Sequence, residues 1–198
     1  MSTVILFHSA LGLRPAVRRF AETLRADGHE VFTPDLFEGK VFDRLEDGVA
    51  ERDAIGIPGL MQRTAEAVAG LPEDSVYMGF SMGAASAQWL AMTRTGARGA
   101  VLMHAALPPG AFGLDRWPRR LPAQIHYAAG DPWVDARVVE ALRESAPDAV
   151  DVHTYGGDGH LFADEEAPEY DPGSASKMMH AVRTFLAAQP SGNCLQYS

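Results

Sequence analysis

The chain has 198 residues, of which 46% are hydrophobic, and this length predicts a single domain with one buried core over residues 1–188. The net charge of −9, without a stripe of basic residues, argues against nucleic acid or an anionic membrane surface as a partner. The single cysteine, Cys194, excludes a disulfide framework and a cysteine metal site. No signal peptide precedes the first predicted strand, so we expect a cytoplasmic protein.

Apolar runs and stretches with helical periodicity alternate along the chain. Six short segments predict strands over residues 3–7, 30–33, 75–79, 99–103, 124–128 and 149–155, the first of them a continuous apolar run. Amphipathic stretches predict helices over 15–26, up to about 55, 60–69, 81–93, 134–145 and 174–187, with a break at 56–59. Repeated strand–helix units with short links predict a mostly parallel, doubly wound six-stranded sheet with helices on both faces. Residues 189–198 form a polar tail that we expect to be disordered.

The stretch Gly79-Phe80-Ser81-Met82-Gly83 lies where the third predicted strand gives way to a helix. A serine between two glycines in such a turn is typical of a nucleophile elbow, which projects the hydroxyl from the turn. The following helix directs free N–H groups and its positive dipole end toward an oxyanion beside Ser81. Alternatively, the glycines only allow close packing of the strand against the helix. We interpret Ser81 as the candidate nucleophile.

Residues that directly follow the apolar runs are the candidates for chemistry, because ligands bind beyond the carboxyl ends of the strands in an open α/β sheet. Ser81 follows the third strand, Asp131 the fifth and His160 the sixth. The order Ser, Asp, His along the chain is the one that α/β hydrolases use. A neutral imidazole suits proton abstraction from serine near pH 7, and a carboxylate fixes its tautomer. The sequence therefore predicts a catalytic triad of Ser81, Asp131 and His160.

Other residues compete for the acid and base roles. Asp135, expected inside the next helix, and Asp158, expected to shape the loop before His160, are the alternative acids. His8 and His104 also follow strands at the carboxyl edge of the sheet. Each could line the pocket or act as a hydrogen-bonded structural residue, and the sequence leaves both readings open.

Backbone N–H groups and loop side chains complete the predicted site. The oxyanion hole is predicted to combine the N–H of Met82, just after the nucleophile, with that of Ala10, in the loop after the first strand. The predicted substrate-binding side chains lie in the same loops and strand exits: Ser9, Phe37, Trp133 and Phe162, with Trp117 as a further aromatic candidate. Packing in the core is the alternative for the aromatic residues.

Five motifs occur in the order in which one hydrolase family carries them. They are Phe-His-Ser-Ala-Leu-Gly at 7–12, Thr-Pro-Asp-Leu-Phe at 33–37, Gly-Phe-Ser-Met-Gly at 79–83, Asp-Pro-Trp-Val at 131–134 and His-Leu-Phe-Ala-Asp at 160–164. With them the chain resembles the dienelactone hydrolase family, small α/β hydrolases without a large cap domain, from about Val4 to Leu186. The resemblance implies a three-layer α/β-hydrolase sandwich. It also implies the triad Ser81, Asp131 and His160, with oxyanion N–H groups at Ala10 and Met82.

Two positions depart from the pattern of that family. The characterised lactone hydrolases carry a cysteine nucleophile and a glutamate in the first loop, where this chain has Ser81 and Ser9. They also carry an arginine after the catalytic histidine that holds the carboxylate of the substrate, where this chain has Asp164. Further acidic residues crowd the loop around Asp164, and Arg14 is the one nearby cation that the sequence identifies. We therefore expect turnover of neutral esters and uncharged lactones in preference to carboxylate-bearing dienelactones.

These observations favour a serine hydrolase that cleaves a small ester, lactone or thioester through an acyl-enzyme, without metal or cofactor. The expected partner is the small-molecule substrate, and the expected assembly is a monomer or homodimer. An acyl transferase or perhydrolase would use the same triad. A non-catalytic ligand-binding protein could keep the same fold, because a fold does not guarantee a function.

Overall fold

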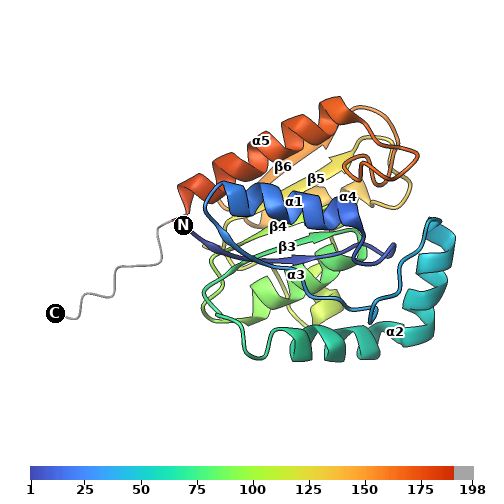
Figure 1. Cartoon of the computed structure of the whole chain (residues 1–198). Helices are drawn as coiled ribbons and strands as arrows, with labels where there is room; N and C mark the ends of the chain where they lie inside the picture. The colour runs from blue at the N-terminus through green and yellow to red at the C-terminus, as the bar shows by residue number, and fades with distance from the viewer. Residues whose placement is uncertain (190–198) are drawn as a thin grey trace.

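A computed structural model describes residues 1–189, and its centre is one six-stranded sheet (Figure 1). The strands lie in the order β2-β1-β3-β4-β5-β6, and every neighbouring pair runs parallel. Their bounds are β1 Thr3–Phe7, β2 Glu30–Phe32, β3 Val76–Phe80, β4 Gly99–Met103, β5 Ala123–Ala128 and β6 Val150–Tyr155. The predicted parallel, six-stranded α/β architecture is confirmed. The sequence predicts a polar tail over residues 189–198, and residues 190–198 lie outside the described residues.

Helices cover both faces of the sheet. Figure 1 shows α1 and α5 on one face, and α2, α3 and α4 contribute to the apolar core on the other face. Residues of β1 alternate between the two cores, with Leu6 on the α1 side and Phe7 on the α3 side. Burial on both faces explains the continuous apolar runs of the central strands β1, β3 and β4, whereas the edge strands β2 and β6 are partly exposed. The helix bounds are α1 Pro15–Ala26, α2 Leu45–Ala67, α3 Met82–Thr93, α4 Ala136–Ser145 and α5 Pro172–Ala188.

The break that the sequence predicts over 56–59 is narrower in the structure. α2 changes direction at Gly56, whose φ of 74° and ψ of 162° are non-helical. Pro58 and Gly59 belong to the second half of the helix, because proline is tolerated in a first turn, where its missing N–H has no helical acceptor. The two halves of α2 run in different directions (Figure 1).

Side-chain caps set the first residues of two other helices. The carboxylate of Asp135 accepts a hydrogen bond from the N–H of Arg137 at 3.0 Å, so Asp135 lies just before α4 and not inside it. Asp171 caps Gly173 in the same way, and α5 begins at Pro172, two residues before the predicted start. The sequence analysis missed a short 3₁₀ helix, η1, over Pro109–Phe112. No helix within residues 1–189 is both long and apolar enough to cross a membrane.

The strand order also determines where loops from distant parts of the chain meet. The chain moves from β1 outward to β2, and β3 then pairs with the other side of β1. In such a sheet, a crevice forms beyond the carboxyl ends of the two strands at which the direction of winding reverses. Here these strands are β1 and β3. The loop that begins at His8 and the turn at Ser81 therefore lie side by side.

Candidate active site

Ser81 occupies a strained turn between β3 and α3. Its φ of 51° and ψ of −111° lie in a region that residues with side chains rarely adopt. The neighbouring glycines allow the close packing that holds this turn. A Cβ on Gly79 would overlap the backbone of Gly83, and a Cβ on Gly83 would lie 2.5 Å from the carbonyl oxygen of His8. This geometry matches the predicted nucleophile elbow.

The side chains of Ser81, His160 and Asp131 form a continuous hydrogen-bonded chain. Ser81 Oγ lies 2.7 Å from His160 Nε2, and His160 Nδ1 lies 2.8 Å from Asp131 Oδ2. The other carboxylate oxygen of Asp131 accepts the N–H of Trp133 at 2.9 Å. Because the carboxylate is an acceptor, it favours the tautomer with the proton on Nδ1, which leaves Nε2 free to accept the serine proton.

His160 and Asp131, the candidate base and acid, are shielded from water. His160 and Asp131 have relative exposures of 5% and 6%. The alternative acids lie elsewhere: Asp135 caps α4 and pairs with Arg137 at 2.9 Å, and Asp158 is exposed in the loop before His160. The structure therefore brings together the three residues that the order of strand exits predicts.

The two backbone N–H groups predicted for an oxyanion hole come from neighbouring strand ends. Ala10 lies in the loop after β1, and Met82 is the first residue of α3. Within residues 1–189, neither N–H donates a hydrogen bond to a protein acceptor. The positive end of the α3 dipole adds to the attraction for a negative oxygen beside Ser81.

His8 is a buried residue that links two loops through its ring nitrogens. It is fully buried, its Nε2 accepts the N–H of Leu36 at 2.9 Å, and its Nδ1 lies 2.7 Å from the carbonyl oxygen of Ser9. The carboxylate of Asp35 lies 3.6 Å from His8 Nε2 and accepts the N–H groups of Phe37 and Gly39 at 2.9 and 2.7 Å. His8 thus fastens the loop after β2 to the loop after β1.

His104 is also fully buried, but it differs from His8 in its partners. Neither ring nitrogen has a hydrogen-bond partner within residues 1–189. The ring packs edge-on against Phe162 at a centroid distance of 4.6 Å and against His160 at 6.1 Å. Burial, and secondarily the nearby His160, holds the pKa of His104 well below its usual range. His104 is therefore neutral near pH 7.

Trp133 has the largest exposed fraction of the side chains predicted to bind substrate. It is 52% exposed, and its ring centroid lies 5.6 Å from that of His160. Phe162 is only 2% exposed and packs beneath the site against Tyr155 at 4.8 Å. A ring in this position is a support for the site, with little surface to offer a substrate.

Three of the side chains considered for substrate binding are buried in the structure: Phe37, Ser9 and Trp117. Phe37 is fully buried and packs edge-on against His8 at 5.2 Å, so in the structure it is a core residue. Ser9 is 2% exposed, and its Oγ accepts the N–H of Leu11 at 3.1 Å. Trp117 is fully buried, with its indole N–H bonded to the carbonyl oxygen of Leu121. The position of a residue after a strand did not predict whether its side chain is buried.

Arg14, the cation nearest to the oxyanion loop in sequence, already has an acidic partner. Its Nε lies 3.3 Å from a carboxylate oxygen of Glu166, and its Nη2 donates to the carbonyl oxygen of Glu166 at 3.1 Å. Asp164 is 8% exposed, and its burial raises the pKa of its carboxyl group. The loop after His160 is thus tied to the start of α1 by a partly buried ion pair.

A third apolar cluster joins the loops that carry the proposed catalytic groups. It contains Leu11, Leu161 and Ala167, with Phe42 and Leu45 packed against it. Leu11 directly follows Ala10, and Leu161 directly follows His160. The sequence analysis missed this cluster, because its members come from three loops and the start of α2, without a shared periodicity.

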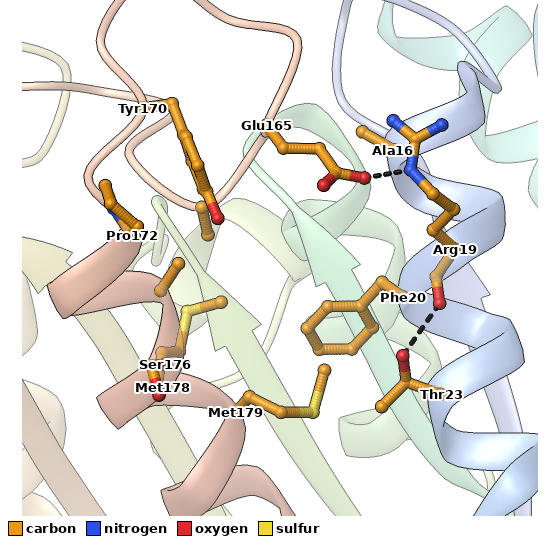
Figure 2. A pocket seen from close by; sticks show the side chains of 12 residues that line it. Ala16, Arg19, Phe20, Thr23, Glu165, Tyr170, Pro172, Ser176, Met178 and Met179 are labelled. Carbon is orange, nitrogen blue, oxygen red and sulfur yellow. Dashed lines mark hydrogen bonds and ion pairs between the residues drawn. The ribbon is translucent and has the colours of Figure 1, made fainter.

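A pocket of about 370 Å³ lies apart from this site, between α1, α5 and the loop that precedes α5 (Figure 2). Figure 2 shows Phe20 and Met179 pointing into it, and Arg19 and Glu165 directed toward each other at its rim. None of its lining residues belongs to the Ser81–His160–Asp131 chain. Within residues 1–189, no group of three or more His, Cys, Asp or Glu side chains is arranged to hold a metal ion.

A parallel α/β sheet with a serine elbow, followed along the chain by a hydrogen-bonded aspartate and histidine, defines the class of α/β hydrolases. The model of the dienelactone hydrolase family matches residues 1–189, and the chain belongs to this family. No curated protein matches the sequence significantly.

Solved structures show the same fold at low sequence identity. A dienelactone hydrolase-like promiscuous phosphotriesterase from metagenomic libraries is 21% identical, with a TM-score of 0.76 over 94% of this chain and 86% of that one. A putative dienelactone hydrolase from Klebsiella pneumoniae is 16% identical, with a TM-score of 0.73 over 95% and 87%. A dienelactone hydrolase from Anabaena variabilis is 17% identical, with a TM-score of 0.69 over 96% and 87%.

Proposed function

We propose that the protein is a serine hydrolase that cleaves a small ester, lactone or thioester through an acyl-enzyme. The observation that carries this proposal is the hydrogen-bonded chain from Ser81 to His160 at 2.7 Å and from His160 to Asp131 at 2.8 Å. The spacing fits a nucleophile, a general base and a carboxylate that orients the base. Membership of the dienelactone hydrolase family supports hydrolysis as the reaction class.

In the proposed reaction, Ser81 Oγ attacks the carbonyl carbon of the substrate while its proton passes to Nε2 of His160. The carbonyl oxygen becomes an oxyanion that the N–H groups of Ala10 and Met82 stabilise. The tetrahedral intermediate collapses, and the proton on Nε2 passes to the leaving oxygen or sulfur. A water molecule then repeats the sequence on the acyl-enzyme, with His160 as its base, and releases the acid. Asp131 stays ionised and stabilises the imidazolium in both halves.

We infer that the preferred substrates are uncharged. Recognition of a carboxylate in a site shielded from water needs a fixed cation, because an unpaired buried charge is costly. Arg14 is engaged by Glu166, and the loop after His160 carries Asp164, where the resemblance to the characterised lactone hydrolases implies an arginine. Trp133 offers apolar surface beside His160, which suits an aryl or alkyl group.

Two other functions are compatible with the same residues. An acyl transferase or perhydrolase would use an alcohol or peroxide in place of water to release the acyl group from Ser81. A ligand-binding protein would keep the fold without turnover. The intact chain of hydrogen bonds between three side chains favours an enzyme over a binding protein.

Hydrolysis of p-nitrophenyl acetate and of a carboxylate-bearing analogue tests both parts of the proposal. We expect a burst of nitrophenol equivalent to one acyl group per protein, followed by steady turnover. We also expect kcat/KM to be higher for the neutral ester, with the difference narrowing at high salt, because salt screens repulsion of the anion. A folded protein without burst or turnover on neutral and anionic esters would contradict the hydrolase proposal. A preference for the anion would contradict only the substrate class.

A further inference from the structure

The peptide between Ala10 and Leu11 is held at both of its polar ends. Its N–H, on Leu11, donates to Ser9 Oγ at 3.1 Å. Its carbonyl oxygen, on Ala10, lies against Gly48 in the first half of α2. A Cβ on Gly48 would overlap this oxygen and lie 2.7 Å from the carbonyl carbon, closer than real side chains approach a backbone. Only glycine allows this contact without displacing one of the two segments.

Gly48 reaches the loop because α2 is divided at Gly56. The first half of α2 runs in a different direction from the second half (Figure 1), and it meets the loop after β1 through Gly48. One direct contact, and two contacts through the segment that precedes α2, keep the first half of α2 beside this loop. The N–H of Phe42 donates to the carbonyl oxygen of Leu11 at 3.0 Å, Lys40 pairs with Glu51 at 2.8 Å, and Leu45 packs against the cluster of Leu11 and Leu161.

We propose that Ser9 and Gly48 are positioning residues that fix the Ala10–Leu11 peptide and thereby aim the N–H of Ala10 into the oxyanion hole. This inference rests on the proposed function. An oxyanion donor must lie within about 2.7–3.1 Å of the developing charge, and a misplacement of about 1 Å reduces turnover on the order of 100-fold. The carbonyl of Ala10 and its N–H are joined through one Cα, so a shift of the carbonyl also moves the N–H.

The substitution Gly48→Ala tests this role, with Gly59→Ala as the matched control in the same helix. A Cβ on Gly59 would meet only the γ2 methyl group of Ile55, at 3.0 Å, and no backbone atom of the loop after β1. Active sites are counted by exhaustive labelling with a fluorophosphonate, so that loss of folded protein does not count as loss of turnover. We expect kcat per labelled site to fall on the order of 10–100-fold in Gly48→Ala, with KM changed less than about threefold. Gly59→Ala should retain kcat and KM.

Ser9→Ala gives a second test that introduces no clash. It removes the acceptor for the N–H of Leu11 and should lower kcat on the order of 10-fold at an unchanged KM. A trifluoromethyl ketone, which forms a tetrahedral adduct with the serine, should lose affinity in parallel with kcat in both variants. The pH at which kcat/KM reaches half its maximum reports on the base and should not move.

The outcomes separate this inference from the proposed function. An inactive wild-type protein would refute the proposed function itself. An active wild type with kcat per site within twofold in Ser9→Ala and in any folded Gly48→Ala would overturn the positioning role. A rise in KM at constant kcat would also overturn it, because it would make these residues part of a substrate-binding wall. If Gly48→Ala does not fold, Ser9→Ala and the trifluoromethyl ketone decide the question.

Discussion

His160 and His104 lie beside each other at the carboxyl edge of the sheet, with ring centroids 6.1 Å apart, but their surroundings differ. His160 has a polar partner on each nitrogen, Ser81 on Nε2 and Asp131 on Nδ1. His104 has no partner on either nitrogen within the described part of the chain, and aromatic rings surround it. Both are buried, with exposures of 5% and 0%.

Backbone strain and position after a strand do not distinguish Ser81, the candidate nucleophile, from His104. Ser81 and His104 directly follow the neighbouring strands β3 and β4, and both have positive φ, 51° and 66°. Each also donates its N–H to the carbonyl oxygen of the next strand at 2.7 Å. The hydrogen-bond partners of the side chain are what differ. At this edge, the partners of a side chain therefore indicate chemistry better than its position or its strain.

Removal of the serine hydroxyl should produce the largest effect. Ser81→Ala deletes the partner on Nε2 of His160, and we expect kcat on a neutral ester to fall about 10³-fold or more, because triad members act as a unit. Ser176→Ala, on the exposed side of α5 in the pocket of Figure 2, is the control and should leave kcat unchanged. Steady-state turnover with matched protein concentrations checks both variants. Residual turnover within tenfold of wild type would remove Ser81 from the proposed mechanism.

Asp131→Asn changes the partner on the other nitrogen of His160. The amide keeps the shape of the side chain but favours the wrong imidazole tautomer, so we expect kcat to fall about 10²–10⁴-fold in a folded protein. Asp135→Asn is a matched control, because asparagine also caps helices well and Asp135 lies outside the triad. Near-normal turnover of Asp131→Asn would reopen Asp158 as the acid.

The free energy of unfolding should fall as the pH decreases from 7 to 5. Burial lowers the pKa of His104 well below its usual range and that of His126 to about 3, so both stay neutral in the folded protein. The unfolded chain binds protons at these residues below about pH 6.5, which favours unfolding; for His126 the cost is about 2 kcal/mol at pH 5. The contribution of these two neutral histidines to the free energy of unfolding is complete above pH 6.5. It is lost as the pH falls toward their pKa values in the folded protein.

Urea unfolding at pH 7 and pH 5 measures this change. The difference between the two pH values should shrink in His126→Gln, whereas the surface substitution His180→Gln serves as the control. A wild-type free energy that does not change between pH 7 and pH 5 would contradict the assignment of buried, neutral histidines.

Trp133→Ala should produce the smallest effect. The substitution removes the exposed ring 5.6 Å from His160 but keeps the backbone N–H that donates to Asp131. We expect KM for an aryl ester to rise about 3–10-fold with kcat within about threefold, because the ring offers apolar contact and does no proton transfer. Tyr170→Ala, in the pocket between α1 and α5, should leave both constants unchanged. A large fall in kcat would instead give the indole ring a role in orienting His160.

The fold and the candidate triad could be predicted from sequence because both depend on local signals in a regular order. Apolar runs of about five residues alternate with helical periodicity, so the six strands and their carboxyl ends can be counted along the chain. Parallel strands bring these ends to one edge, where Ser81 directly follows β3, and Asp131 and His160 lie in the loops after β5 and β6. Element type was correct for these strands and helices, and the boundaries differ by a few residues where caps such as Asp135 set them.

Side-chain surroundings could not be predicted in the same way. Phe37 and Phe162 both lie in loops that follow strands, and both are buried. Whether such a ring faces solvent or the core depends on which other segment covers it. Gly48 and Ala10 lie 38 positions apart, and no periodicity links them. Packing of the loops also determines that Ser9 Oγ has a hydrogen-bond partner, whereas the ring nitrogens of His104 have none within residues 1–189.

Labelling with a fluorophosphonate tests the central claim most directly. The probe reacts with an activated serine, and intact-mass analysis followed by peptide mapping identifies the modified residue. We expect one adduct per protein, on Ser81, formed at least about 100-fold faster than in His160→Ala, since His160 accepts the proton of the attacking hydroxyl. No adduct on the folded protein, or an adduct on Ser9 or Ser86, would contradict the account.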